Sequence, residues 1–425
     1  MGRTDVRGVA LLAALLLVTA LAGCGDPAAR ANEVKVTLAN HVWSTAIQKL
    51  IPEFEAETGL DVTVSTLGEN QLSDQYNVKL NAGTDDIDVM MFRPLQEGRQ
   101  FIHNKWLADL TDRTGDAAYR WDDFMESARG AVSDGDRVYG VPLITEREIL
   151  YYNADLLRRA GIDGPPETLD DLITAARQVK ERVPDTFGFV ARGQRSPAVT
   201  QFSSYLFSCG GDFDDGTRST LNTPEAIRAY EIYTELLREV GPPGTSNMNW
   251  PDAFAVFQQG RAAFLTDADS LFANLTDPEK SRVADQVGFA RFPAGSAGSK
   301  PYNVTSWGLA INDVSTHQDN AWRFVQWATS PEVTLRMQQA GTPSARDSVW
   351  ADPSSTANLP PELVRVIKDS FSGSVGHDRP RLMKVPQARD IVGGPLVTGQ
   401  EGGDIAAAAA KAAEEYNELL AKERR

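Results

Sequence analysis

Cysteine and histidine, on which most metal sites and many nucleophile sites depend, are scarce in this sequence. There are two cysteines and four histidines: Cys24, Cys209, His41, His103, His317 and His377. The histidines are scattered, none lies in a His-Glu-x-x-His motif, and neither a Gly-x-Ser-x-Gly elbow nor a Walker phosphate loop is present. We therefore expect no enzyme of these classes, no bound metal and no cofactor.

One acidic run needs separate comment. Asp212 to Gly216 has the acidic spacing of a calcium loop, but its glycine comes one position early and no glutamate closes it. We interpret this run as a turn. If Cys24 is modified, only Cys209 remains, which excludes an intrachain disulfide and favours a packing role for Cys209.

A basic surface and a second long hydrophobic run are also missing. The chain has 42 Lys and Arg against 58 Asp and Glu, a net charge of −16 that would repel nucleic acid. After the N-terminus no apolar run approaches the ~20 residues of a transmembrane helix, and no repeat or heptad pattern is visible. Apolar residues at 42% and a length of 425 suit two or three soluble globular domains.

The one long apolar run lies at the N-terminus. Arg3 and Arg7 precede an Ala-, Leu- and Val-rich stretch from Val9 to Leu21, typical of a signal-peptide core and too short to span a bilayer comfortably. The residues that close it, Leu21 to Cys24, resemble the lipobox of bacterial lipoproteins. This resemblance implies a signal peptide over 1–23, a diacylglyceryl anchor on Cys24 and a tether over 24–33. The alternatives are an ordinary secretory signal with a chance cysteine, or a core cysteine.

Strand and helix patterns alternate through the first hundred residues of the body. Residues 34–38 alternate apolar and polar side chains, 47–54 have helical spacing with Pro52 predicting a kink, and 62–64, 72–80 and 87–92 read as strand, helix and strand. This alternation predicts a parallel α/β unit. Further strands are expected at 261–265 and 305–311, and further helices at 320–328, 331–340 and 404–422.

Several short segments, taken in order, resemble family 1 extracellular solute-binding proteins of ABC importers, the maltose-binding-protein-like type. Besides the lipobox, these segments are 54–59, 88–90, 139–142, 259–263, 306–308 and 341–344. The resemblance covers essentially the whole mature chain. It implies an α/β fold of two lobes with three hinge crossings, near 141–145, 264–266 and 303–308, around a central ligand cleft that closes over a carbohydrate-type ligand.

The same resemblance implies a domain division and partners. The N-terminal lobe would comprise 34–141 and 267–304, and the C-terminal lobe 142–266 and 305–425. The ligand would be a small neutral sugar, oligosaccharide or sugar alcohol, and the partners would be the permease subunits of an ABC importer. The protein would be a monomer held at the outer face of the cytoplasmic membrane by its lipid, with no contact to nucleic acid.

Side chains that suit a polyhydroxy ligand follow the predicted strands. Carboxylates, amides and arginines bind hydroxyl groups, aromatic faces cover C–H surfaces, and α/β sheets bind ligands beyond the carboxyl ends of their strands. The predicted ligand-binding residues are His41, Trp43, Glu69, Gln71, Arg93, Glu146, Arg147, Asp267, Asp269, Trp307 and Arg346.

Each of these residues has an alternative interpretation. Trp43 and Trp307 could be half-buried core residues, Asp267 or Asp269 could cap a helix, and Glu146 could pair with Arg147 between the lobes. Whether Arg346 reaches the ligand stays open. We expect a neutral or negative cleft with at least two aromatic faces, which disfavours sulfated or phosphorylated sugars.

Among the cleft residues, Trp307 is predicted to be a ligand platform beside the flexible Gly308. Two other functions remain open: a glycan-processing lipoprotein with paired carboxylates, and a surface adhesin without a small ligand.

Overall fold

A mixed β-sheet organises the fold in the computed structural model, which describes residues 32–423. The proposed signal peptide and Cys24 lie outside these residues. The strand order is β2-β1-β3-β10-β6-β8-β7, with β9 also paired to β6 and β4 paired to β5 in a separate hairpin. The strands are β1 Glu33–Ala39, β2 Asp61–Leu67, β3 Val89–Phe92, β4 Ser133–Asp134, β5 Arg137–Val138, β6 Val141–Asn153, β7 Phe187–Val190, β8 Ala262–Ala268, β9 Val287–Arg291 and β10 Asn303–Ile311.

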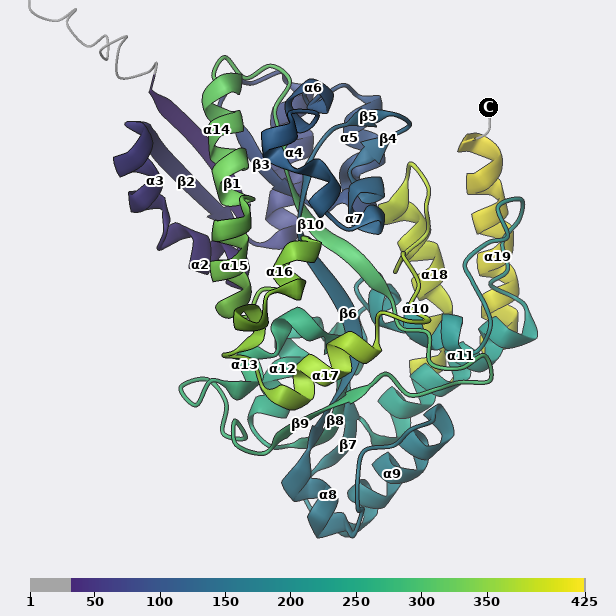
Figure 1. Cartoon of the computed structure of the whole chain (residues 1–425). Helices are drawn as coiled ribbons and strands as arrows, with labels where there is room; N and C mark the ends of the chain where they lie inside the picture. Colours follow the sequence, from purple (N-terminus) through teal and green to yellow (C-terminus); the bar gives the residue numbers. More distant parts are fainter. Residues whose placement is uncertain (1–31, 424–425) are drawn as a thin grey trace, which may run out of the picture.

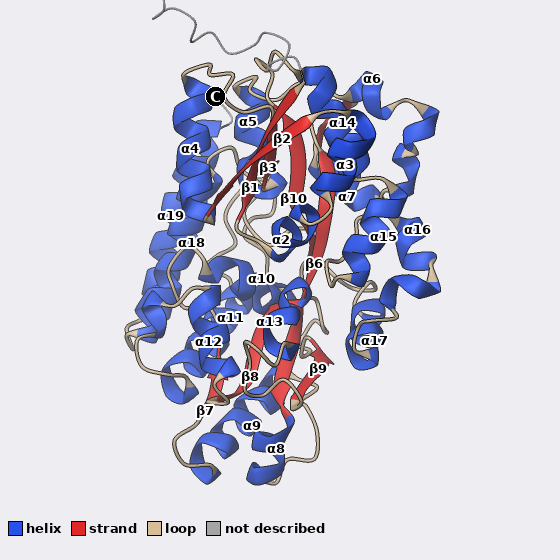
Figure 2. Ribbon diagram, turned by 90° about the vertical axis from the view of Figure 1, so that its left-hand side faces the viewer, coloured by secondary structure: helices blue, strands red, loops and turns tan. Residues whose placement is uncertain are grey.

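The first lobe is built on the parallel strands β1, β2 and β3, as the sequence predicted. Helices cover both faces of these strands, with α4 on one side and α3 and α14 on the other (Figure 2). One continuous hydrophobic core joins 34–144 to 307–345. Helices of this lobe are α2 Val42–Gln48, α3 Ile51–Thr58, α4 Glu69–Asn81, α5 Arg99–His103, α6 Thr111–Thr114, α7 Glu126–Ala131, α14 Gln318–Ala328 and α15 Pro331–Gln339.

The second lobe surrounds β7, β8 and β9. Two hydrophobic cores, one on each side of these strands, together contain residues between 149 and 420. Its helices are α8 Ala154–Ala160, α9 Leu169–Arg182, α10 Ala198–Ser208, α11 Pro224–Glu235, α12 Trp250–Gln258, α13 Ala273–Thr276, α17 Pro361–Asp369, α18 Val385–Gln400 and α19 Ile405–Glu423, while α16 Asp347–Ala351 lies in the segment that leads back from the first lobe.

Strand β6 connects the two lobes. Its first half pairs with β10, and its second half, from Glu148 on, pairs with β8 and β9. In Figure 1 the strand runs from the upper lobe into the lower one. Residues 144–148 therefore lie at the junction, near the first crossing that the sequence predicted.

The domain division differs from the expected one in the last third of the chain. Residues 267–304 were expected in the first lobe, but Leu271, Phe272 and Phe289 pack in a core of the second. Residues 305–345 were expected in the second lobe, but they pack in the first. The reason is the position of β10 between β3 and β6, which sets α14 and α15 against the first sheet.

Two local predictions also need correction. Pro52 does not kink one helix, because α2 ends at Gln48 and Pro52 lies in the first turn of a new helix, α3, where proline is tolerated. Asp267 does not follow its strand, because β8 continues to Ala268. Among residues 32–423, no helix has both the length and the apolar character needed to cross a membrane.

Candidate functional site

A cavity of about 720 Å³ lies between the two lobes. The first lobe contributes His41, Glu69, Ser73, Arg93, Gln96, Glu97 and Trp307, among others, and the second contributes Arg192, Thr200, Trp250, Tyr302, Asp378, Arg379 and Arg389, among others. Glu146, on the connecting strand β6, also lines it. This cavity is the central cleft that the sequence predicted.

Loops that follow parallel strands supply the key side chains. His41 comes two residues after β1, Glu69 two after β2, Arg93 directly after β3, and Arg192 two after β7. The carboxyl ends of β1, β2 and β3 lie at one edge of the first lobe, and β7, which runs in the opposite direction in the second lobe, ends facing them across the cavity. The chain thus places guanidinium groups, carboxylates and an imidazole around one space.

Arg93 is held by three groups of the first lobe. Its guanidinium donates hydrogen bonds to Glu97 at 2.8 Å, to Ser73 at 2.6 Å and to Glu69 at 3.2 Å. Burial alone would lower the pKa of Arg93, but Glu97 and Glu69 outweigh it and the pKa is raised. The Nε atom of Arg93 is buried and has no hydrogen-bond partner among the described residues, so it remains available as a donor.

The opposite wall contains a second set of arginines. Arg379 and Arg389 each donate to Oε1 of Gln96, at 2.9 and 3.0 Å, which joins the second lobe to the first across the cavity. Arg379 also pairs with the buried Asp378 and keeps the pKa of that carboxyl low despite its burial. These contacts fix the guanidinium groups before any ligand arrives.

Glu146 and His41 meet at the base of the cavity. Nε2 of His41 lies 3.9 Å from Oε1 of Glu146, and the Ser270 hydroxyl donates to the same oxygen. Burial lowers the pKa of His41 to about 4 and raises the pKa of Glu146 to about 7. Nδ1 of His41 accepts a hydrogen bond from the backbone N–H of Trp43, so the neutral imidazole carries its proton on Nε2, toward Glu146.

Trp307 lines the cavity, although little of it is open. Its side chain is 4% exposed, the Arg93 guanidinium lies 5.8 Å from the ring centroid, and the His41 ring lies 5.9 Å away. The indole therefore supports Arg93 and His41. A pyranose ring has little of the Trp307 face left to stack on.

Five of the predicted residues line this cavity: His41, Glu69, Arg93, Glu146 and Trp307. Their neighbours in space carry a balanced charge, because the lining includes five arginines and six carboxylates: Arg93, Arg192, Arg195, Arg379, Arg389, Glu69, Asp74, Glu97, Glu146, Asp378 and Asp390. Trp250, Tyr302 and Trp307 are its aromatic residues. This composition agrees with the expected near-neutral cleft.

The other predicted residues lie elsewhere. Trp43 is 1% exposed in the first-lobe core, because α2 begins at Val42 and turns the indole inward. Gln71 is exposed on α4 and does not line the cavity. Arg147 is fully buried and donates to Asp269 at 2.9 Å, which is an internal ion pair.

Asp267 and Arg346 are buried and do not line the cavity. Asp267 is fully buried and accepts two hydrogen bonds from Arg192, so it holds a cavity residue without reaching the cavity. Arg346 is also fully buried and donates to Asp123 and to the carbonyl of Thr329, within the first lobe. The guanidinium of Arg346 stacks on Phe124 at 3.9 Å, which accounts for its position.

The sequence analysis missed Arg192, Gln96, Tyr302, Asp378, Arg379 and Arg389. The strand-end rule would have found Arg192, because it lies two residues after β7, as His41 lies two residues after β1. No such signal marks Arg379 and Arg389, which lie in the segment before α18 and in α18 itself. Only the tertiary fold brings them to the cavity.

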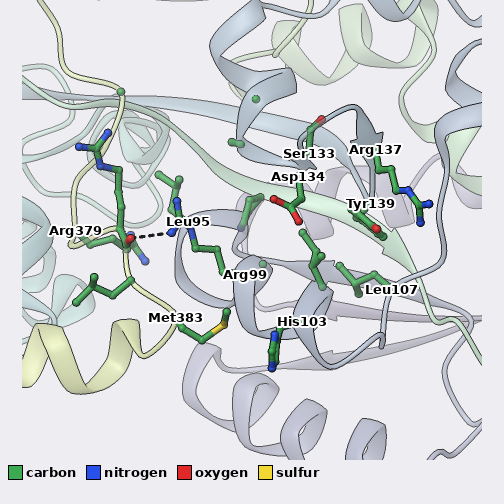
Figure 3. Close-up of a pocket in the computed structure, with 18 of the residues that line it drawn as sticks. Leu95, Arg99, His103, Leu107, Ser133, Asp134, Arg137, Tyr139, Arg379 and Met383 are labelled. Atoms are coloured by element: carbon green, nitrogen blue, oxygen red, sulfur yellow. Dashed lines mark hydrogen bonds between the residues drawn. The ribbon is translucent and has the colours of Figure 1, made fainter. Parts of the chain in front are cut away.

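A larger cavity, about 980 Å³, lies on the other side of η1 (Pro94–Gly98). Figure 3 shows Leu95 and Arg99 between Arg379 and Met383 on one side and Tyr139 on the other. Of the residues within two positions after β1, β2 or β3, only Pro94 lines this larger cavity. The polar residues at these strand ends, His41, Glu69 and Arg93, line the smaller cavity instead. Arg379 borders both spaces.

No group of three His, Cys, Asp or Glu side chains suited to a metal ion occurs within residues 32–423. The arrangement of the smaller cavity offers hydrogen bonds in both directions: guanidinium donors, carboxylate acceptors and an imidazole N–H. Such a set suits a neutral ligand with several hydroxyl groups, each of which donates one hydrogen bond and accepts others.

Comparison with known families gives one match over most of the chain. A family model described as bacterial extracellular solute-binding protein matches residues 41–334. An erythritol/L-threitol-binding protein of Mycolicibacterium smegmatis is 26% identical over 350 residues, covering 76% of this chain and 71% of that protein. A mannitol-binding protein of Pseudomonas aeruginosa is 27% identical over 338 residues, covering 78% and 73%.

Solved structures share the fold. A solute-binding protein of Agrobacterium radiobacter K84 in complex with ribitol superposes with a TM-score of 0.81 at 27% identity, covering 91% of this chain and 98% of that one. A maltose-bound protein of T. maritima gives a TM-score of 0.82 at 24% identity, with 91% and 99% covered, and is similar in fold. These matches agree with the two-lobed α/β fold expected from the sequence.

Proposed function

Because this chain belongs to the bacterial extracellular solute-binding proteins, the solute-binding components of ABC importers, we propose that it captures a small acyclic polyol between its lobes. One observation carries the choice of ligand: the cavity is lined by oriented guanidinium and carboxylate groups, while the Trp307 face is already covered by Arg93 and His41. Each hydroxyl group of an acyclic polyol can accept a hydrogen bond from a guanidinium group and donate one to a carboxylate. A pyranose ring would also use an open aromatic face, which Trp307 does not offer.

Relatives support the same ligand class. The two proteins at 26% and 27% identity are described as binding erythritol or L-threitol and mannitol, and the structure at 27% identity contains ribitol. These ligands differ in length but share vicinal hydroxyls and neutrality. The proposed acyclic polyol is the sugar-alcohol member of the wider ligand class expected from the sequence, which also includes sugars and oligosaccharides.

We infer that five predicted residues contact the ligand: His41, Glu69, Arg93, Glu146 and Trp307. Arg192, Arg379 and Arg389 join them as donors from the second lobe. Because both lobes contribute, closure of the cleft would complete the hydrogen bonds and exclude water. The loaded protein would then deliver its ligand to the permease subunits of an ABC importer.

Calorimetric titration tests this proposal. A protein that lacks residues 1–24 would be titrated with erythritol, ribitol, mannitol and maltose, and we expect saturable binding of at least one polyol that is tighter than binding of maltose. Arg93→Met should weaken that binding, while Arg282→Met, at an exposed residue outside the cavity, should not. Tighter binding of maltose than of every polyol would contradict the choice of ligand.

Binding without turnover is part of the proposal. Prolonged incubation with oligosaccharides should release no product, and product release would support the alternative of a glycan-processing lipoprotein. A melting temperature unmoved by every solute would support the adhesin. At 100 times its dissociation constant a ligand stabilises the protein by about 2.7 kcal/mol, so a clear rise is expected.

We also propose that the protein is a monomer anchored by lipid on Cys24 at the outer face of the cytoplasmic membrane. The lipobox-like Leu21 to Cys24 and the polar stretch after it support this anchor. Wild-type protein should incorporate labelled palmitate and partition into detergent, and Cys24→Ser should do neither. Sedimentation of the protein without residues 1–24 should give one species of monomer mass.

A further inference from the structure

Three segments besides its own strand reach the Glu146 carboxyl group in the cavity. Glu146 lies on β6, at the point where this strand passes from one lobe to the other. Oε1 of Glu146 accepts a hydrogen bond from Ser270 of η6 (Asp269–Leu271) and lies 3.9 Å from Nε2 of His41, while Ser306 of β10 also interacts with the carboxylate. Any closure of the lobes changes the surroundings of this carboxyl group.

The groups that face Glu146 favour a carboxylate that accepts hydrogen bonds. The Ser270 hydroxyl donates to it, and the neutral His41 directs its Nε2–H toward it. Arg192, on the loop after β7, attracts the ionised form, whereas the nearby Asp269 repels it. Tyr151 and Tyr302 also lie within electrostatic reach, but the pKa of each is raised well above 10, so both stay neutral.

Two opposing influences therefore act on this carboxyl in the free protein. Burial and Asp269 favour the protonated form, and the donors together with Arg192 favour the ionised form. The outcome is a pKa of about 7, well above the ordinary 4.5. A small additional interaction with the ionised form can therefore change the protonation state near neutral pH.

We propose that a ligand hydroxyl donates a hydrogen bond to the Glu146 carboxylate, so that ligand capture expels one proton from this site and becomes weaker as the medium turns acidic. This inference rests on the proposed function. The arginines of the cavity are donors only, so the hydroxyl hydrogens of a bound polyol need acceptors, and an ionised carboxylate is the strongest acceptor among the lining groups. Within the described residues, two carboxylates that line the cavity form no ion pair with an arginine, Asp74 and Glu146, and because Asp74 is exposed, Glu146 is the enclosed acceptor.

Proton linkage gives the expected size of the effect. If ligand binding moves the Glu146 pKa to about 5, the dissociation constant rises by up to about tenfold for each pH step from 7 to 5, and it levels off above and below this range. The released protons come from Glu146 to buffer, with no other reactant. His41 contributes little in this range because its pKa of about 4 keeps it neutral.

The experiment is calorimetric titration of the protein without residues 1–24 with erythritol, ribitol and mannitol between pH 5.5 and 8.5. We expect the dissociation constant of the bound polyol to rise at least tenfold from pH 8 to pH 5.5. At pH 6.5, titrations in buffers of different ionisation enthalpy should report between half and one proton released per ligand. Glu146→Gln should bind with a dissociation constant that stays constant across this range.

Each outcome has one meaning. A constant wild-type dissociation constant, or proton uptake on binding, would overturn the role of Glu146 and leave the proposed function intact. A pH dependence that persists in Glu146→Gln would also overturn it, because another group would carry the proton. Absence of binding for all three polyols at every pH would overturn the proposed function and this inference together.

Discussion

Arg192 and Asp267 form a two-point ion pair behind the cavity wall: Nε of Arg192 donates to one carboxylate oxygen at 3.0 Å and a terminal nitrogen donates to the other at 2.6 Å. Asp267 is fully buried and also accepts from Gln201 and from the backbone of Ala268. Arg192 lines the cavity. The buried carboxylate thus orients a guanidinium whose remaining N–H groups are left for a ligand.

Arg192→Met should affect both stability and binding. It leaves Asp267 buried without its cation, so we expect a loss of about 3 kcal/mol or more in the free energy of unfolding. It also removes a ligand donor, so the dissociation constant for the bound polyol should rise at least tenfold. Urea unfolding and calorimetric titration measure the two effects separately.

The control is an arginine in an exposed ion pair. Arg228 donates to Asp170 at 2.9 Å, but the aspartate side chain is 81% exposed. Arg228→Met should change neither property measurably, because exposed pairs contribute little. If Arg192→Met bound polyol like wild type, Arg192 would serve only to neutralise Asp267.

Trp307→Ala should weaken ligand binding by about 2 kcal/mol or more, on the scale of a buried aromatic anchor. The indole contacts Arg93 and His41, so its removal frees two cavity residues to move. Trp327, which packs against Phe54 at 5.0 Å and does not line the cavity, is the matched control. Trp327→Ala should lower the melting temperature only. If Trp307→Ala did only that as well, Trp307 would be a core residue.

Arg346→Met should destabilise the first lobe without weakening ligand binding. The variant loses the hydrogen bonds to Asp123 and to the carbonyl of Thr329 and the stacking on Phe124, and it leaves Asp123 with only Ser348 and the more distant Arg120 as partners. We expect a loss of about 3 kcal/mol in the free energy of unfolding. Calorimetric titration at a temperature well below unfolding should give the wild-type dissociation constant, and a weaker one would restore Arg346 as a ligand-site residue.

Local patterns predicted much of the first lobe because its strands and helices follow one another closely. Residues 34–92 form the expected parallel unit, since alternation and helical spacing are properties of short segments. The lobe to which residues 305–345 belong depends instead on a long-range strand pairing. Only the pairing of β10 with β3, more than 200 residues earlier in the chain, sets that segment in the first lobe.

The same distinction applies to the cavity. The strand-end rule found His41, Glu69 and Arg93, but it could not separate His41 from Trp43, because one helix start between them turns the first outward and the second inward. Arg379 and Arg389 follow no strand, and they reach Gln96 from 283 and 293 residues away. A single sequence offers no signal for contacts of that range.

Two titrating groups at the base of the cavity act on stability in opposite directions. The folded state holds the Glu146 pKa at about 7, above its ordinary 4.5, so it binds more protons than the unfolded state between these values. This difference adds stability as pH falls from 7 to 4.5. The folded state holds the His41 pKa at about 4, below its ordinary 6.5, so the unfolded state binds more protons and stability is lost as pH falls from 6.5 to 4.

Between pH 6.5 and 4.5 the two effects overlap, and each amounts to about 1.4 kcal/mol for each pH step. Glu146→Gln removes the gain, so its unfolding free energy should fall relative to wild type as pH drops through this range, while His41→Asn removes the loss and should rise by a similar amount. Urea unfolding of the ligand-free proteins at pH 4.5, 5.5 and 6.5 measures both, and other carboxylates cancel in the comparison because all three proteins share them. Parallel curves for wild type and both variants would mean that neither group has the protonation state that its burial implies, and the Glu146 proton would then not be available for release by a ligand.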